Sequence, residues 1–520
     1  MECRNIHLCS RAHLTLKVSK NVKILTEKCT KQDQCPKPAF YVFFWVKINI
    51  MMMLLGAMVA TLMDKWGLAK TKRRKDDPRL ADFAPLGNSF DATYTDHIYR
   101  QSTDVVNRPI SGVPGAIVRL KDRYSDDHGW TQKYTGSETE VINLGSYNYL
   151  GFSHRSGVCA EAAAQYIDKF GINCGGSRQE QGNHLVHKSV DRTIAEYLRV
   201  EDAIVFPMGF ATNSMNIPSL VDEGSLILSD RLNHASLVTG CRLSGANTLV
   251  FKHSDAKDCE KKLRDALCDV SPKTGKKYNK VLIIIEGIYS MEGTIVDLPS
   301  FIAIKKKYNC YLFLDEAHSI GAVGPTGRGV AEYWGCNPKD IDIMMGTLTK
   351  SFASAGGYMG GSKKVIDHIR RHSAGTVYGV TMSPPLIAQV ETAVTVTFII
   401  GIDNLKSCSR LCAEKTERIS AVKKPFNFSR TLDISGRNFV NVAFWFTEMM
   451  IVRCEFSRRM LKHNIGIVAV GYPATPLLEA RVRFCLSADH TREHLDYILE
   501  ALEQVGEETN TFYGTKITDE

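Results

Sequence analysis

Short, uninterrupted apolar runs alternate with longer amphipathic stretches through the middle of this chain, and this alternation most constrains its fold. Helix-length segments such as 255–268 and 298–308 lie between the runs. The predicted strands are 203–207, 225–229, 248–252, 281–285, 310–314 and 341–346. Runs that are apolar at every position, rather than at alternate positions, are typical of strands buried on both faces. The pattern therefore predicts an α/β domain with a mainly parallel sheet covered by helices.

Chemically reactive side chains follow several of these runs. His234 lies shortly after the run 225–229, and Glu286 and Ser290 follow 281–285. Asp315 directly follows 310–314, and Lys350 follows 341–346. In open α/β sheets the active site forms beyond the carboxyl ends of the strands. We therefore expect these side chains to meet at one edge of the sheet.

The strand-end aspartate and lysine indicate pyridoxal phosphate (PLP) chemistry. A lysine amine forms a Schiff base with the cofactor's aldehyde, and a carboxylate keeps the pyridine nitrogen protonated so that the ring withdraws electrons. Lys350 lies among hydroxyl residues and precedes the small-residue run 353–357. A lysine in such a stretch is by itself usually an ordinary loop lysine. The presence of both Lys350 and Asp315 at strand ends favours the PLP interpretation.

The phosphate of such a cofactor has candidate ligands on two segments. Gly209 and Phe210 follow a strand and open a predicted helix, where backbone amides suit a phosphate. A glycine before a helix is common, so this signal is weak alone. The side chains of Thr347 and Thr349 could add hydroxyl donors to the same group.

The cofactor ring and the substrate have candidate ligands as well, each with an ordinary structural alternative. His234 could stack on a flat ring and His318 could bind one of its polar atoms, but either could be a capping or core histidine. Ser290 could hydrogen-bond the ring or simply occupy a turn. Arg483 lies on a predicted strand and could clamp an amino-acid carboxylate, with a surface salt bridge as the alternative.

The two ends of the chain differ from this central pattern. After the large domain, strands at 438–445, 466–470 and 482–487 and a helix at 491–505 predict a smaller α+β domain. The predicted divisions are a basic tail at 1–38, a membrane segment at 39–65, a linker and arm at 66–135, the PLP-binding domain at 136–385, and the small domain at 386–520.

The segment 39–63 is almost wholly apolar and is broken by Lys47. A complete crossing takes about 20 residues, and the uninterrupted part, 48–63, has 16. The alternatives are a membrane segment, a buried core helix and a cleaved signal. Five of the six residues 70–75 are basic, a pattern typical of a cytosolic flank, which favours the membrane segment.

Composition excludes several classes of function. A hydrophobic content of 44% indicates a globular chain, and a net charge of +9 over 520 residues is mild. No basic stripe interleaved with aromatic residues is present, so we expect no nucleic-acid partner. No Cys-x-x-Cys pair occurs, so we expect no metal site. The 15 cysteines show no disulfide framework, which fits a reducing compartment.

Together these motifs resemble the α-oxoamine synthase family of fold-type-I PLP enzymes. The resemblance covers about 136–392 and 455–505. Besides the lysine stretch, it is carried by Asn143–Gly151, Ser177–Glu180, Met208–Asn216, Asp315–Gly321, Gly324–Gly329, Met382–Pro385 and Pro473–Pro476. The regions 1–60 and 393–450 match poorly. Where the family usually has glycine, this chain has Ala353, so we expect a backbone conformation there that alanine disfavours.

Within this family the chain is most similar to members that condense L-serine with a long-chain acyl-CoA, palmitoyl-CoA, to give 3-ketosphinganine, carbon dioxide and CoA. This is the first step of sphingolipid synthesis. The resemblance implies roles for Lys350 (Schiff base and α-proton removal), Asp315 (pyridine nitrogen), His234 (ring stacking), His318 (3′-oxygen), Thr347 (phosphate), Arg483 (serine carboxylate), and Tyr147 and Asn148 (substrate).

The resemblance also implies partners and a location. Such enzymes are dimers, and here we expect a related non-catalytic subunit, with the turn 381–383 reaching the partner's site. The expected location is the endoplasmic reticulum membrane, with the catalytic domain facing the cytosol. Two alternatives stay open: another α-oxoamine synthase, such as 5-aminolevulinate synthase, or a non-catalytic scaffold subunit. Lys350 argues against the scaffold, which has no need of a Schiff-base lysine.

Overall fold

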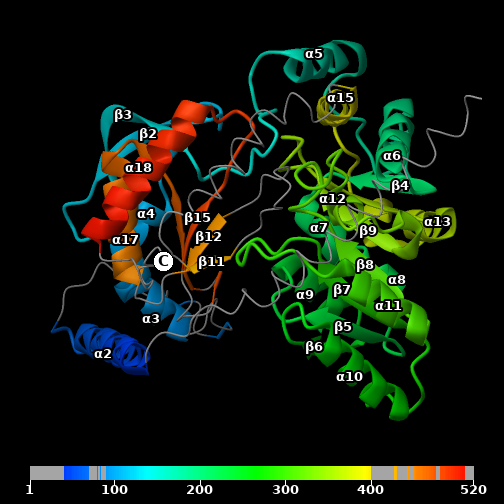
Figure 1. The fold of residues 1–520 in the computed structure, drawn as a ribbon, viewed down its shortest axis with the longest axis horizontal. Helices are drawn as coiled ribbons and strands as arrows, with labels where there is room; N and C mark the ends of the chain where they lie inside the picture. The colour runs from blue at the N-terminus through cyan, green and yellow to red at the C-terminus, as the bar shows by residue number, and fades with distance from the viewer. Residues whose placement is uncertain are drawn as a thin grey trace, which may run out of the picture.

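The computed structural model describes residues 40–68, 79, 82–83, 89–399, 427–429, 442–445, 450–472, 474–475 and 481–509. The predicted tail 1–38 and the basic residues 70–75 lie outside them. Two bodies stand side by side in Figure 1, one built around a seven-stranded sheet and the other around two four-stranded sheets.

The large sheet has the strand order β4-β10-β9-β8-β7-β5-β6. Every pair in it is parallel except those of β10, which runs antiparallel to both β4 and β9. Its strands are β4 (Asp202–Phe206), β5 (Leu226–Asp230), β6 (Asn247–Phe251), β7 (Val281–Glu286), β8 (Tyr311–Asp315), β9 (Ile343–Thr347) and β10 (Gly357–Gly361). The α/β prediction is confirmed. The strand β10 was not predicted, because its glycines leave no apolar run.

Helices cover both faces of this sheet because its strand side chains point alternately to either side. Ile283 and Leu312 belong to a core that includes residues of α6 (Leu185–Leu198), α10 (Ala256–Cys268) and α11 (Leu298–Tyr308). Ile284 and Phe313 belong to the opposite core, with α9 (Ala235–Leu243) and α13 (Lys363–His372). This double cover is what the continuous apolar runs predicted.

Shorter elements complete the description. The other helices around the large sheet and in the N-terminal arm are α3 (Ser89–His97), η2 (Tyr99–Ser102), α4 (Thr103–Val106), α5 (Val158–Phe170), α7 (Gly209–Ser214), α8 (Ile217–Leu220), α12 (Gly329–Tyr333), η3 (Pro338–Asp340), α14 (Ala374–Val377) and α15 (Pro384–Ile399).

The smaller body combines the N-terminal arm with the C-terminal region. One sheet has the order β1 (Ile110–Ser111), β2 (Ile117–Tyr124), β3 (Lys133–Asn143) and β13 (Ile465–Gly466). The other has the order β11 (Asn427–Ser429), β12 (Val442–Trp445), β15 (Arg481–Phe484) and β14 (Val468–Val470). The helices α17 (Met450–Lys462) and α18 (Arg492–Glu508) pack with these sheets.

The strand β3 crosses the domain boundary that the sequence placed at residue 136. It pairs with β2 and, in parallel, with β13 of the C-terminal region, rather than with the large sheet. The N-terminal arm is therefore part of the smaller body, because its strands complete a sheet whose last strand lies more than 300 residues further along the chain.

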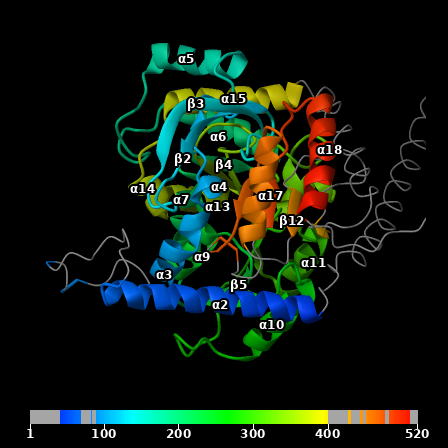
Figure 2. The same cartoon turned by 90° about the vertical axis from the view of Figure 1, so that its left-hand side faces the viewer.

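The helix α2 (Phe40–Lys65) has 26 residues and includes the stretch Lys47–Asp64, which is long and apolar enough to cross a membrane. It packs against α3 and runs along one edge of the molecule, as Figure 2 shows. Length and composition alone make this weak evidence for a membrane segment.

Candidate active site

Lys350 lies in the tight connection between β9 and β10. Hydrogen bonds from Leu348 N to Gly356 O (2.9 Å) and from Ser354 N to Leu348 O (3.0 Å) fold this connection back on itself. Ala353 takes φ +48° there, a left-handed conformation that L-residues other than glycine, asparagine and aspartate seldom adopt. The expectation of a glycine-like backbone at Ala353 is confirmed.

The Lys350 amine is half-buried and bound to His318. Its Nζ donates to His318 Nε2 at 2.7 Å. Burial lowers the pKa of Lys350 to about 8, although the charges of Asp315 and Glu286 raise it, and the charge of Arg483 lowers it further. A larger fraction of this amine is therefore neutral near pH 7 than of an ordinary lysine, and the neutral amine is the nucleophilic form.

His318 is buried and lies between Lys350 and Tyr149. Its Nδ1 lies 2.9 Å from the Tyr149 hydroxyl. Burial, and then the positive charges of Lys350 and Arg483, lower the pKa of His318 well below its ordinary value, so the ring is neutral. Because Nε2 accepts from Lys350, the proton belongs on Nδ1, which donates to Tyr149. Sequence analysis included Tyr149 in a motif but gave it no role.

Asp315 ends β8 and is held by Asn213 of α7. Its Oδ2 accepts from Asn213 Nδ2 at 2.8 Å, and its Oδ1 accepts from the backbone N–H of Ala317 at 2.9 Å. Asn213 Nδ2 also donates to Ser236 Oγ of α9 at 3.0 Å. The carboxylate is therefore held by α7 and by the loop after β8, and α9 positions Asn213 for its contact. Sequence analysis missed this role of Asn213, although the residue lies in a family motif.

His234 caps the start of α9 and leaves its ring exposed. Its Nδ1 lies 2.8 Å from Ser236 Oγ, and its backbone N–H donates to the buried Glu286. Partial burial lowers the pKa of His234, with Asp315 raising and Lys350 lowering it. The Phe210 ring lies edge-on, with centroids 6.1 Å apart. An exposed, mainly neutral imidazole beside Asp315 and Lys350 is suited to cover a flat ring.

The predicted phosphate ligands also meet. Thr347 Oγ1 lies 2.7 Å from Thr349 Oγ1 and donates to Gly356 O at 3.1 Å. A Cβ at Gly209 would come within 2.9 Å of Thr347 Oγ1, so α7 can start this close to the end of β9 only with glycine. The hydroxyls of these threonines and the first turn of α7 thus lie together, although they are more than 130 residues apart in the sequence.

Arg483 reaches the site from β15 of the smaller body. Its guanidinium carbon lies 4.5 Å from the centre of the Tyr147 ring, and its Nη1 donates to Ser290 Oγ at 3.2 Å. Its buried Nε has no hydrogen-bond partner among the described residues. A buried guanidinium with a spare donor suits a carboxylate ligand. The Lys350 Nζ lies 5.5 Å from the same Tyr147 ring.

Asn148 is placed differently from the other predicted residues. Its side-chain amide donates to Pro114 O at 3.2 Å and to Ser153 Oγ at 2.6 Å, so it braces neighbouring loops. A role of Asn148 at the substrate stays a prediction. The turn 381–383 is held by hydrogen bonds from Thr381 to Gly176 O, and its predicted reach into a partner's site also stays a prediction.

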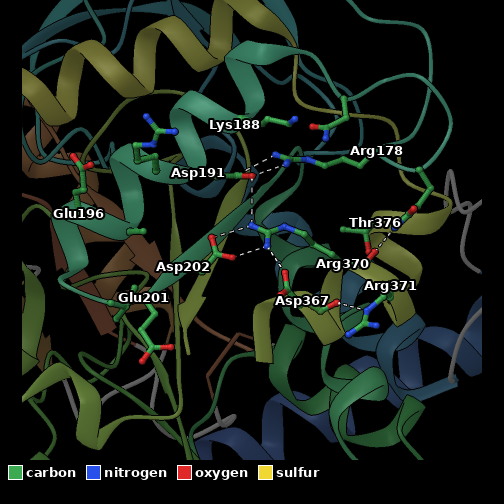
Figure 3. Close-up of a pocket in the computed structure, with 15 residues that line it drawn as sticks. Arg178, Lys188, Asp191, Glu196, Glu201, Asp202, Asp367, Arg370, Arg371 and Thr376 are labelled. Carbon is green, nitrogen blue, oxygen red and sulfur yellow. Dashed lines mark hydrogen bonds and ion pairs between the residues drawn. The ribbon is translucent and has the colours of Figure 1, made fainter. Parts of the chain in front are cut away.

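A separate hollow of about 1040 Å³ lies between α6 and α13 (Figure 3). Several of its charges pair with one another, as in Arg178–Asp191 at 2.6 Å and Arg370–Asp202 at 2.5 Å, and none of the predicted site residues lines it. Within the described ranges, no cluster of three or more His, Cys, Asp or Glu residues is arranged to hold a metal ion.

Comparison with known proteins identifies the family. Residues 139–502 match the family model described as aminotransferase class I and II. Serine palmitoyltransferase 3 of Caenorhabditis elegans is 79% identical over 496 residues, which is 95% of this chain and 96% of that protein. The human serine palmitoyltransferase 3 is 44% identical, with 87% of this chain and 82% of that protein covered. The chain belongs to the serine palmitoyltransferase family.

Solved structures of this family have the same fold. A Sphingomonas wittichii serine palmitoyltransferase matches with a TM-score of 0.69 and 26% identity, covering 82% of this chain and all of that one. A serine palmitoyltransferase structure described as containing PLP matches with a TM-score of 0.64 and 25% identity, covering 73% of this chain and 90% of that one.

The residues of this chain fit PLP as the cofactor. The amine of Lys350 and the fixed carboxylate of Asp315 lie close enough that the charge of Asp315 raises the pKa of the amine. The threonine hydroxyls, the exposed face of His234 and the partnerless Nε of Arg483 supply the remaining donors and a ring-covering surface. Each part of the cofactor and of an amino-acid substrate therefore has a matching group.

Proposed function

We propose that this chain is the catalytic subunit of a serine palmitoyltransferase. It condenses L-serine with a long-chain acyl-CoA, with loss of carbon dioxide, to give 3-ketosphinganine. The observation that carries this proposal is the Lys350 amine, whose pKa is lowered to about 8 and which lies within the electrostatic influence of Asp315. A non-catalytic subunit has no use for such an amine, and the alternative of a scaffold is therefore not favoured.

When bound, PLP supplies a protonated ring that stabilises negative charge at the α-carbon of serine. Asp315 would hold the pyridine nitrogen, and Asn213 keeps the carboxylate in place for that contact. His234 would cover the ring. The hydroxyls of Thr347 and Thr349 would hold the phosphate.

Lys350 would hold the cofactor through its aldehyde, and its Nζ would take the α-proton of serine. A lysine with an ordinary pKa is protonated at neutral pH and is a poor base, so the lowered pKa of Lys350 serves both steps. His318 accepts a hydrogen bond from Nζ and thereby aims the amine.

Arg483 would bind the carboxylate of serine before it leaves as carbon dioxide. Ser290 and the Tyr147 ring hold the guanidinium on two sides. The spare Nε donor then provides the contact to substrate. By holding the carboxylate, Arg483 would also orient the bond between the carboxylate carbon and the α-carbon, which breaks when carbon dioxide leaves.

A related non-catalytic subunit is the expected partner, in a heterodimer. Exposed apolar side chains near the glycine-rich segment 171–176 support this proposal: Leu185 is 75% exposed and Tyr378 83%. Ile172 and Val380 are also exposed, and their segments are linked by the Ser177–Val380 bridge and by a hydrogen bond from Ser383 to Ile172 O. Such a patch is typical of a protein–protein interface.

The proposed location is the endoplasmic reticulum membrane, with the catalytic domain in the cytosol. The apolar helix α2 and the basic residues 70–75 after it support this orientation. A membrane tether suits an acyl-CoA, since its acyl chain partitions into lipid.

An assay of membranes that carry this chain and a candidate partner tests the function. Labelled L-serine with palmitoyl-CoA is expected to give 3-ketosphinganine, and Lys350→Ala should abolish it. Labelled glycine with succinyl-CoA serves as the comparison, because it is the substrate pair of 5-aminolevulinate synthase. The proposal would be contradicted if product formed only from glycine with succinyl-CoA, or if Lys350→Ala kept full activity.

A further inference from the structure

The connection between α10 and β7 is an exposed, basic turn. Residues 269–280 contain four lysines, at positions 273, 276, 277 and 280, and one acidic residue, Asp269. All four lysines are exposed. The reaction proposed above gives this turn no role, since none of its residues contacts the lysine site.

The turn is folded against the ends of two helices. Lys273 Nζ donates to Gly245 O at 2.6 Å, just after α9, and Lys277 Nζ donates to Cys268 O at 2.7 Å, at the end of α10. Within the turn, Ser271 N donates to Lys276 O at 2.8 Å. The Lys280 amine likewise donates to Leu220 O at 3.1 Å. Three of the four lysines therefore brace the turn, while all four residues stay exposed on its surface.

Large apolar side chains stand exposed beside these lysines. Val270, the second residue of the turn, is 51% exposed, and Leu243 at the end of α9 is 64% exposed. The hydrogen bond from Lys273 to Gly245 brings the end of α9 against the turn. Exposed aliphatic residues surrounded by lysines are typical of surfaces that rest on a bilayer, where the apolar groups enter the interface and the lysines meet anionic headgroups.

The turn lies on the same side of the molecule as α2. Figures 1 and 2 differ by a rotation about the vertical axis, and in both views α2 and α10 form the lower edge. In Figure 2, α2 runs along this edge rather than away from the body. One plane drawn along the edge therefore touches α2 and the end of α10.

The side of α2 that faces away from the body is apolar. Ala57 is 4% exposed and Thr61 Oγ1 lies 3.1 Å from His97 Nε2 of α3, so this side of the helix faces the protein. The exposed residues on α2 include Met51, Met52, Leu55, Met58, Val59 and Leu62. Their spacing of three to four residues places them on one helical face.

We propose that the turn 269–280, with Leu243, is a second membrane contact that binds the surface of a bilayer containing anionic lipid. This inference rests on the membrane attachment through α2 proposed above. The catalytic domain then rests on the membrane at two points, α2 and the turn, so that the large sheet keeps a fixed orientation to the bilayer.

Cys268, an exposed free cysteine at the end of α10, provides a probe next to the turn. The full-length chain with its partner would be reconstituted in nanodiscs of phosphatidylcholine, with or without phosphatidylserine. The rate of Cys268 alkylation would be measured by mass spectrometry of its peptide. We expect phosphatidylserine to slow alkylation at least threefold, since one lysine near an anionic surface contributes roughly a fivefold preference.

The variant Val270→Asp with Lys276→Glu should remove this protection. The matched control is Ile167→Asp with Lys169→Glu on α5, because both residues are exposed and α5 lies at the opposite, upper edge in both views. The control should keep the protection. Equal alkylation rates in the two lipid mixtures, in a chain that stays in the nanodisc and forms product, would overturn the second contact alone. Loss of the chain from the nanodiscs would overturn both membrane contacts.

Discussion

The reactivity of Lys350 offers the sharpest test of the site. Its pKa is lowered to about 8, first by burial, then modified by charges of opposite sign nearby. Asp315 raises this pKa and Arg483 lowers it. Asp315→Asn should therefore move the pKa of Lys350 down, and Arg483→Gln should move it up. Two variants that should shift the pKa of Lys350 in opposite directions test this account more strictly than one variant would.

The size of the effect follows from the pKa itself. With a pKa of about 8, about one Lys350 amine in ten is neutral at pH 7, whereas with the ordinary value of 10.5 about one in 3,000 would be. The neutral amine is the form that reacts with acylating reagents, so the reactive fraction of Lys350 at pH 7 should be about 300 times that of a lysine with an unshifted pKa.

The assay is pulse acetylation of the cofactor-free protein across a pH series, followed by mass spectrometry of the Lys350 peptide. An exposed lysine in the same digest, such as Lys276, corrects for decay of the reagent. We expect the midpoint for Lys350 near pH 8, lower in Asp315→Asn and higher in Arg483→Gln. A wild-type midpoint above pH 10, or shifts of the same sign in both variants, would refute the electrostatic account of the site.

Three further predictions concern the cofactor and the stability of the fold. The holoenzyme should show an absorbance band at about 420 nm that borohydride removes, and Lys350→Ala should lack this band. A band that persists in Lys350→Ala would place the cofactor on another amine. Ala353→Gly should raise the free energy of unfolding by about 1 kcal/mol, seen as a higher Tm, because it removes left-handed strain; a lower Tm would contradict this. Glu292→Ala should cost about 3 kcal/mol, because it removes the carboxylate that pairs with the buried Arg481 at 3.1 Å. Adding Arg481→Met should restore most of that loss in denaturant unfolding, and a further loss would show that the ion pair is not the cause.

Much of the site could be predicted because its signals are local in the sequence. A continuous apolar run marks a strand buried on both faces, and the residue after that run lies at the edge where active sites form. Asp315 follows such a run directly, and Lys350 follows another after three intervening residues. The conformation of Ala353 was expected from the family resemblance, because the family usually has glycine at that position. The predictions for Asp315 and Lys350 depend on a few neighbouring residues and on a general rule for parallel sheets.

The tertiary structure decided what depends on residues far apart in the chain. Asn213 fixes Asp315 across 102 positions, and Tyr149 meets His318 across 169. No local pattern distinguishes such an asparagine or tyrosine from an ordinary core residue. The strand β3 pairs with β13 because a free sheet edge needs backbone partners, wherever in the chain these occur. The sequence alone determined six of the seven strands of the large sheet and what chemistry stands at their ends. Only folding determined which distant side chains orient that chemistry, because hydrogen bonds depend on distance in space and not on separation along the chain.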